Sequence, residues 1–542
     1  AGMGMAVGMA MAEKHLASVF NKESYPVVDH FTYVLGGDGC MMEGISSEAF
    51  SLAGTLGLGK LIVLYDSNRI SIEGSTDIAF RENVQERMQA FGFQTITVED
   101  GNDIDAIGKA IEAAKADTEH PSFITIKTQI GFGCPAKQGK ASAHGEPLGV
   151  ENVEALRKNL NWPSEEPFFV PEEVYKNYSE IAEQKAEVEA AWNVMFAAYC
   201  EEYPEMEALW NQYHNAKAGE ALKDDAGFWA KQEKPEASRA ISGRLINYIK
   251  DVLPNLFGGS ADLAPSNKTN MKDAGDFSKE DRAGRNLHFG VRELAMAAIG
   301  NGIMLHGGLR AYVSTFFVFS DYCKPMARLS ALMGVPLTYV FTHDSIGVGE
   351  DGPTHEPIEQ MAALRAMPNF HVFRPCDATE TEAAWYSAVT SEHTPTALVL
   401  TRQNLEPMAG SSREALKGGY IIDDCEGTPE LILIASGSEV ALAVHAKETL
   451  AAEGQKVRVV SMPCMDLFEE QSEEYKESVL PREVRRRVAV EALGSFGWDK
   501  YTGLDGKIIA MERFGASAPA GLLFKKFGFT VEHVVEVAKS LK

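Results

Sequence analysis

The sequence predicts an α/β fold made of three consecutive α/β domains with mostly parallel sheets. From residue 31, short β-prone runs such as LIVLYD and SFITIKT alternate with longer helical stretches such as IDAIGKAIEAAKADT. The same alternation begins again near Ala237 and a third time in ELILIASGSEVALAVHAKETLAA. Strands that alternate with helices in this way are typical of parallel sheets that carry helices on both faces.

The limits of the domains follow from where this alternation is interrupted. We expect a first domain at residues 1–205, a helical linker at 206–235, a second domain at 236–410 and a third at 411–542. A chain of 542 residues is long enough for roughly three or four domains, each with its own core. The first residues, AGMGMAVGMAMAEKHLA, have a helical pattern without an initiating Met, so we expect the chain to lack an N-terminal segment.

The composition excludes several classes of protein. The 51 basic and 77 acidic residues give a net charge of −26, which disfavours nucleic acid and anionic membrane partners. We find no apolar run that could span a bilayer and no secretory signal. Seven cysteines without a CxxC pair are typical of reduced thiols, and we therefore expect a cytoplasmic protein.

In the first domain, polar residues follow two successive strands. Asp38 lies in GGDG directly after the FTYVL run, and Asn68 ends the next strand, KLIVLYDSN. An Asp between glycines can be a turn residue that binds neighbouring N–H groups. However, parallel strands end at the same edge of a sheet, where α/β folds bind ligands. The pair therefore favours a Mg²⁺ or Ca²⁺ site, because both side chains offer hard oxygen ligands.

The second domain contains two further patterns. Glu293 precedes a small apolar helical face in HFGVRELAMAAIGNG, where desolvation would favour its protonated form. Alternatively, it is an exposed carboxylate that stabilises a helix N-terminus. Phe316, Phe319 and Tyr322 then recur at spacings of three, and on the pattern alone such a stripe is more often core than a cofactor site.

The densest polar stretch is THDSIGVGEDGPTHEP, residues 342–357. It carries His343, Asp351 and His355 among glycines and a proline. These side chains could bind a metal, but the two histidines do not have the i, i+4 spacing of a helical metal site. A flexible loop that presents imidazoles and carboxylates also suits a polyhydroxylated substrate.

Several of these motifs resemble one enzyme family. GDG followed by Asn68 one strand, helix and strand later resembles the thiamin diphosphate signature, and GDGCMMEGISSEAFSLAGTLGLGKLIVLYDSNRISIEG is similar to transketolases. The loop 342–357 and LTRQN support the same family, and the resemblance covers essentially the whole chain. It implies the thiamin diphosphate-binding fold, with that cofactor and Mg²⁺, for which Ca²⁺ or another divalent ion can substitute. By resemblance, the metal ligands are Asp38, Asn68 and Ile70 (backbone carbonyl), and the cofactor contacts include Asp38, Gly39, Glu43, Asn68 and Ile130.

The resemblance also implies roles for the second domain. The residue matching Glu293 hydrogen-bonds a pyrimidine nitrogen of the cofactor, and Phe316, Phe319 and Tyr322 surround the aminopyrimidine ring. With Glu293, the catalytic residues are His144 and His355, which would move protons near the reacting carbons. The implied sugar phosphate contacts are His144, Arg239, Ser266, His343, Asp351, His355 and Arg402.

The implied activity is reversible transfer of a two-carbon ketol unit in the pentose phosphate pathway. The donor is a ketose phosphate such as xylulose 5-phosphate, and the acceptor is ribose 5-phosphate or erythrose 4-phosphate. The family also implies a homodimer with active sites at the subunit interface. Two alternatives remain: another thiamin diphosphate enzyme, such as a deoxyxylulose phosphate synthase, and a truncated, inactive chain that needs a separate N-terminal segment.

Overall fold

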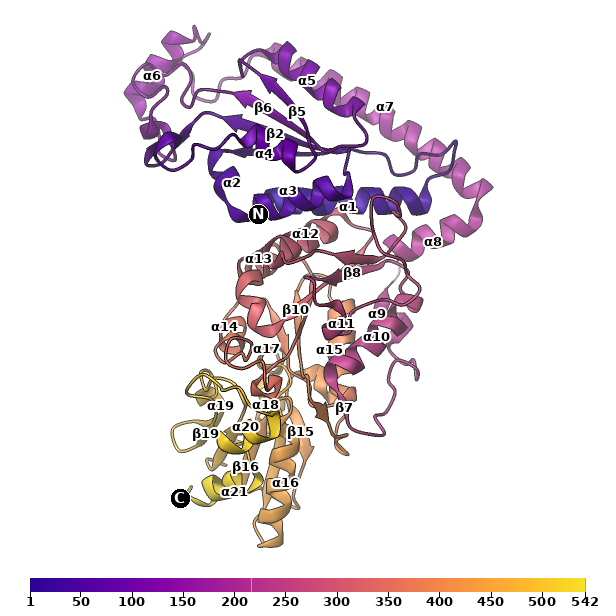
Figure 1. Ribbon diagram of the computed structural model, residues 1–542, viewed down its shortest axis with the longest axis vertical. Helices are drawn as coiled ribbons and strands as arrows, with labels where there is room; N and C mark the ends of the chain where they lie inside the picture. Colours follow the sequence, from indigo (N-terminus) through magenta and orange to yellow (C-terminus); the bar gives the residue numbers. More distant parts are fainter. Residues whose placement is uncertain (216, 542) are drawn as a thin grey trace. The chain divides into compact units, whose positions relative to one another are not determined.

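The computed structural model describes residues 1–215 and 217–541, which form two compact units (Figure 1). The first unit comprises residues 1–212 and 278–283, and the second comprises residues 213–277 and 284–542. One parallel four-stranded sheet lies in the first unit, and sheets of six and five strands lie in the second. These three sheets confirm the predicted α/β fold class with mostly parallel sheets.

The sheet of the first unit has the strand order β1-β2-β6-β5, and all its neighbours are parallel. Thr32 pairs with Leu61 at one end of the first two strands, and Gly37 pairs with Asp66 at the other. In this register both strands end at the same edge, as the sequence predicts. The strands are β1 (Thr32–Gly37), β2 (Leu61–Ser67), β5 (Gln94–Val98) and β6 (Ser122–Lys127).

Helices cover both faces of this sheet (Figure 1). Helix α1 (Gly2–Phe20) confirms the predicted N-terminal helix, and it packs with α3 (Gly44–Leu56) on one face. Helix α5 (Ile104–Ala116) lies on the other face. The remaining helices of this unit are α2 (Asp38–Met42), α4 (Val84–Ala90), α6 (Val150–Asn159), α7 (Glu172–Glu202) and α8 (Pro204–His214), whose last two residues belong to the second unit.

The larger sheet of the second unit has the order β12-β13-β11-β10-β8-β9 and is parallel throughout. All residues of β11 (Thr338–Thr342) and β13 (Thr396–Leu400) are buried, as expected for a parallel sheet covered on both faces. The other strands are β8 (Leu256–Ser260), β9 (Asn286–His288), β10 (Arg310–Phe316) and β12 (His371–Phe373). The helices are α9 (Ala218–Leu222), α10 (Ser238–Val252), α11 (Ala264–Asn267), α12 (Glu293–His306), α13 (Ser320–Met333), α14 (Gln360–Arg365) and α15 (Ala378–Thr390).

The smaller sheet has the order β15-β17-β16-β18-β19, in which only the β15–β17 pair is antiparallel. Its strands are β15 (Tyr420–Asp423), β16 (Leu431–Ala435), β17 (Val457–Ser461), β18 (Arg487–Val490) and β19 (Lys507–Ile509). Its helices are α16 (Glu439–Ala452), α17 (Met465–Glu469), α18 (Glu473–Val479), α19 (Asp499–Thr502), α20 (Ala520–Lys526) and α21 (Val531–Lys539). Across residues 1–215 and 217–541, none of the helices has the length and apolar character needed to cross a membrane.

Candidate active site

The predicted Asp–Asn pair lies at the carboxyl edge of the first sheet. Asp38 is only 4% exposed, and its two carboxylate oxygens accept hydrogen bonds from the Tyr65 hydroxyl at 2.5 Å and the Arg69 amide at 2.8 Å. Asn68 Oδ1 accepts a hydrogen bond from the Ile70 amide at 2.9 Å. Burial and the bond to Asp38 raise the pKa of Tyr65, so its hydroxyl stays protonated and donates. The sequence reasoning missed Tyr65 and Arg69, although both lie beside Asn68 in LYDSNR.

A cavity of about 540 Å³ adjoins this pair. Asp38 and Asn68 both line it, which confirms that the two strand ends bring them together. Arg69, Arg81 and Lys127 line the same cavity, and Arg69 is paired with Asp77 at 2.9 Å and Lys127 with Glu99 at 2.5 Å. A buried carboxylate, an amide oxygen and nearby cations suit a divalent ion that carries an anionic ligand. Among the described residues, this lining does not include the other predicted contacts of the first unit, Gly39, Glu43, Ile70, Ile130 and His144.

In the second unit, the three predicted aromatic residues form a cluster, but they do not share one helix. Phe316 ends β10, Phe319 ends a 3-10 helix (Phe317–Phe319), and Tyr322 lies in α13, so the interpretation as a helical stripe is wrong. The Phe316 and Phe319 rings stack with their centroids 6.1 Å apart. The Tyr322 ring centroid lies 6.0 Å from the Phe319 ring centroid. Phe316 is 9% exposed and Tyr322 is 61% exposed, so the cluster extends from the core to the surface.

Both histidines of the loop 342–357 lie against these aromatic rings. The His343 ring centroid is 3.8 Å from that of Phe316, and His355 meets Phe319 edge-on at 5.6 Å. His343 is buried and has a φ of 64°, a left-handed conformation that is uncommon outside glycine. The aromatic residues and the loop histidines, which the sequence analysis treated separately, therefore lie together in one cluster.

Two of the predicted phosphate-binding residues, Arg239 and Arg402, lie close to His343 of the same cluster. Arg239 Nη1 lies 3.3 Å from His343 Nε2 and donates a hydrogen bond to the Ser266 carbonyl oxygen at 2.8 Å. Burial lowers the pKa of Arg239, and the charge of Arg402 lowers it further. Arg402 is exposed and close enough for its charge to affect both Arg239 and His343. Two guanidinium groups beside an imidazole suit a phosphate ester.

The neighbours of His343 determine its protonation state. Burial, followed by the charges of Arg239 and Arg402, lowers the pKa of His343 to about 3, so the imidazole is neutral at pH 7. Because arginine can only donate, Nε2 is the acceptor and Nδ1 carries the proton. Nδ1 then donates to the Thr342 hydroxyl at 2.8 Å, and that hydroxyl donates to Asn267 Oδ1 at 2.7 Å.

The remaining predicted site residues are Glu293, Asp351 and His144. Glu293 is the first residue of α12 and is half-buried, and the helix continues with the buried apolar face that the sequence predicts. Asp351 is exposed in the loop, and His144 is exposed directly after a short 3-10 helix (Ala141–Ala143) of the first unit. Within the described part of the chain, Asp351 forms no hydrogen bond or ion pair with the aromatic and histidine cluster.

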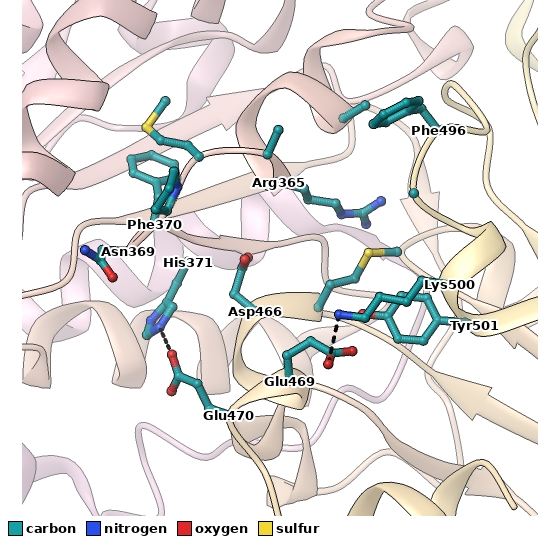
Figure 2. Close-up of a pocket in the computed structure, with 16 residues that line it drawn as sticks. Arg365, Asn369, Phe370, His371, Asp466, Glu469, Glu470, Phe496, Lys500 and Tyr501 are labelled. Atoms are coloured by element: carbon teal, nitrogen blue, oxygen red, sulfur yellow. Dashed lines mark hydrogen bonds and ion pairs between the residues drawn. The ribbon is translucent and has the colours of Figure 1, made fainter. Parts of the chain in front are cut away.

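A second cavity, of about 320 Å³, lies elsewhere in the second unit and is shown in Figure 2. Lys500 is paired with Glu469 at 2.9 Å, and His371 Nε2 lies 3.3 Å from a carboxylate oxygen of Glu470. The residues that line it are different from those of the aromatic and histidine cluster. Its lining carries acidic as well as basic side chains, which distinguishes it from the two arginines near His343.

The fold and the two clusters define a class of α/β enzymes that bind thiamine diphosphate. Family models match three parts of the chain: the transketolase thiamine diphosphate binding domain at residues 1–218, the transketolase pyrimidine binding domain at 234–408, and the transketolase-like C-terminal domain at 418–530. The predicted cofactor class is therefore confirmed by the family models of the first two domains.

Comparison with individual proteins gives the family. A transketolase of Halalkalibacterium halodurans is 52% identical over 100% of this chain and 81% of its own length. Among solved structures, the transketolase from Leishmania mexicana has a TM-score of 0.95 and 45% identity, covering 100% of this chain and 80% of that chain. The chain belongs to the transketolase family and is an enzyme of that family. These matches do not confirm the prediction that an N-terminal segment is lacking.

A transketolase from Pichia stipitis, described as a complex with sedoheptulose-7-phosphate, is also similar. It has a TM-score of 0.94 and 43% identity, and the match covers 100% of this chain and 80% of that chain.

Proposed function

We propose that the chain transfers a two-carbon ketol unit reversibly from a ketose phosphate, such as xylulose 5-phosphate, to ribose 5-phosphate or erythrose 4-phosphate. The observation that carries this proposal is the basic cluster of Arg239, His343 and Arg402 beside the Phe316 ring, in a chain of the transketolase family. The sugar phosphate in the Pichia stipitis structure supports the substrate class. We place the reaction in the pentose phosphate pathway and the enzyme in the cytoplasm.

Asp38, Asn68 and the Ile70 carbonyl would hold a divalent ion, with Mg²⁺ as the preferred ion and Ca²⁺ as a substitute. Support comes from the buried Asp38 carboxylate and its position beside Asn68 at one cavity. When bound, thiamine diphosphate supplies a nucleophilic carbon and an electron sink. The further cofactor contacts proposed in the first unit are Gly39, Glu43 and Ile130.

The remaining proposed roles belong to side chains of the second unit and to His144 of the first unit. Glu293 would hydrogen-bond the pyrimidine of the cofactor, and Phe316, Phe319 and Tyr322 would enclose that ring. Arg239, Ser266, His343 and Arg402 would hold the substrate phosphate, while Asp351 would bind its hydroxyl groups. His144 and His355 would move protons at the reacting carbons.

We also propose a homodimer with active sites at the subunit interface. Each site would combine Asp38 and Asn68 of one protomer with Glu293 and the aromatic cluster of its partner. The proposed domain limits remain 1–205, 236–410 and 411–542, with a linker at 206–235.

The test is a direct assay of the purified chain. Xylulose 5-phosphate and ribose 5-phosphate are mixed with the protein, thiamine diphosphate and Mg²⁺, and the seven-carbon ketose phosphate and glyceraldehyde 3-phosphate are measured. We expect both products, and we expect them to require the cofactor and the metal. Product from pyruvate and glyceraldehyde 3-phosphate instead would favour a deoxyxylulose phosphate synthase. An inactive chain that regains activity with a separate N-terminal segment would favour the truncated alternative.

A further inference from the structure

A buried arginine connects the loop that carries His343 with the C-terminal sheet. Arg374 follows β12, and its Nε and Nη2 atoms lie 2.9 and 2.8 Å from Asp344 Oδ2. Its Nη1 donates to Glu439 Oε2 at 2.5 Å and to the Ser436 carbonyl oxygen at 2.8 Å. The Arg374 side chain is fully buried, and Asp344 and Glu439 are each 1% exposed. The three side chains therefore form a buried ion-pair triad.

The triad holds Arg374 in one charge state and one position. Burial alone would lower the pKa of Arg374, but Glu439 and Asp344 raise it, so the guanidinium stays charged. A Cβ added to Gly437, which has a φ of 56°, would lie 2.7 Å from Arg374 Cζ. Glycine at this turn therefore makes room for the guanidinium. Losing one partner of such a buried pair leaves a charge without compensation.

Asp344 directly follows His343, whose backbone is in the left-handed region with a φ of 64°. Such a conformation persists only where surrounding groups hold it. On one side, Thr342 is hydrogen-bonded to Asn267 at 2.7 Å, and on the other, Asp344 is bound by Arg374. His343 is thus fixed from both sides, with its ring 3.8 Å from Phe316.

The same C-terminal turn, residues 436–439, also reaches the neighbour of Arg402. Ser438 Oγ lies 3.3 Å from Arg374 Nη2 and accepts a second hydrogen bond from Gln403 Nε2, also at 3.3 Å. Gln403 directly follows Arg402 in the chain. One turn of the third domain therefore contacts the sequence neighbours of two proposed phosphate-binding residues, His343 and Arg402.

We infer that Arg374 is a positioning residue for sugar phosphate recognition. Together with the turn 436–439, it holds His343 and Arg402 in the geometry that binds the substrate phosphate, so the C-terminal domain contributes to substrate affinity. This inference rests on the proposed phosphate-binding roles of His343 and Arg402.

The control is Arg458, another buried arginine of the second unit, which is 9% exposed. It donates to both oxygens of Asp424, each at 2.9 Å, rather than to the loop 342–357 or the turn 436–439. Arg374→Met and Arg458→Met should therefore both lower the melting temperature. Only Arg374→Met should change recognition of the substrate phosphate.

The experiment compares KM and kcat for xylulose 5-phosphate and for xylulose, which lacks the phosphate, in the holoenzyme. For Arg374→Met we expect KM for xylulose 5-phosphate to rise about tenfold, with a smaller change for xylulose. Arg374→Lys should restore only part of the affinity, since one ammonium cannot reproduce the planar fork. Should Arg374→Met fail to fold, Asp344→Asn keeps the shape of the side chain and provides the same comparison.

The outcomes separate this inference from the proposed function. If His343→Ala and Arg402→Ala raise KM for xylulose 5-phosphate but Arg374→Met and Asp344→Asn do not, the positioning role is wrong. Equal effects on xylulose and xylulose 5-phosphate would also overturn it. If His343→Ala and Arg402→Ala themselves leave KM unchanged, the proposed phosphate site is wrong.

Discussion

At the scale of single residues, the proposed metal ligand Asp38 is held in one orientation by its neighbours. Its carboxylate is buried, and the Tyr65 hydroxyl and the Arg69 amide each donate to one of its oxygens. A buried carboxylate that accepts such bonds stays oriented, because rotation would leave an oxygen unsatisfied. The second lone pair of each oxygen is still available to a cation.

We predict that Asp38→Ala abolishes metal-dependent binding of thiamine diphosphate, because it removes the charged ligand of the ion. Glu293→Ala should leave substantial binding but stop turnover, since its proposed role begins after the cofactor is bound. Calorimetric titration with thiamine diphosphate, with and without Mg²⁺, measures the first effect, and the ketol transfer assay measures the second. Normal binding and turnover in Asp38→Ala would show that the metal assignment is wrong.

At the scale of elements, a glycine in α3 of the first unit lets this helix lie close to a neighbouring backbone segment. In α3, a Cβ added to Gly54 would lie 1.7 Å from the Phe91 carbonyl oxygen, whereas a Cβ added to Gly108 in α5 would meet nothing within 4 Å. The two glycines occupy helices of the same length, 13 residues each, but only Gly54 faces another backbone segment.

We predict opposite signs for alanine at these two positions. Gly54→Ala should destabilise the protein by about 1–3 kcal/mol, because the added methyl group overlaps backbone that must move. Gly108→Ala should stabilise it by about 0.5–1 kcal/mol, because alanine has the higher helix propensity and the space is open. Urea unfolding of both variants measures the difference, and a stable Gly54→Ala would contradict the packing of α3.

At the scale of the whole molecule, several buried acids make stability depend on pH. Burial raises the pKa of Glu356 to about 7 and of Glu382 to about 8, and both are almost fully buried. A Cβ on Gly515 would lie 1.6 Å from Glu356 Oε2, so glycine makes room for this carboxyl. In both residues the pKa of the folded state lies above the ordinary value of 4.5. The folded state therefore loses stability as pH rises from that ordinary value to the folded pKa.

We therefore predict that the melting temperature falls between pH 6.5 and pH 8, above the range in which the lowered pKa of His343 makes the fold more stable as pH rises. Glu356→Gln should reduce this fall, because glutamine is neutral at every pH and is close in shape to the protonated acid. The exposed Glu426 provides the control, since Glu426→Gln should leave the pH dependence unchanged. Parallel curves for Glu356→Gln and the unsubstituted protein would contradict the prediction.

The proposed homodimer gives a further prediction at this scale. Asp38→Ala and Glu293→Ala protomers, each inactive as homodimers, should form mixed dimers with one intact active site. If protomers mix randomly, half the dimers are mixed and about a quarter of the specific activity returns. Co-expression with two affinity tags and the ketol transfer assay measures this. Activity that stays near zero in purified mixed dimers would place both residues in the same protomer's site.

The sequence alone was sufficient for the α/β alternation and for the Asp38–Asn68 pair. Successive parallel strands must end at one edge, so the spacing of the two residues along the chain predicted their proximity in space. The positions of Arg239 and His343 are different. They are 104 residues apart, and only the family resemblance, not the local pattern, connected them. Tyr65 and Arg69 were missed because the directions of the Tyr65 hydroxyl and of the Arg69 backbone amide are set only in the folded chain.

What the sequence by itself determined is the order of strands and helices and the family to which the chain belongs. Both are recorded locally, in hydrophobic periodicity and in short motifs. Only the tertiary structure decided the tautomer of His343 and the burial of Arg374 between Asp344 and Glu439. These depend on which distant groups replace water around a polar side chain. Periodicity along the chain does not encode those partners, because they come from strands and turns that only folding brings together.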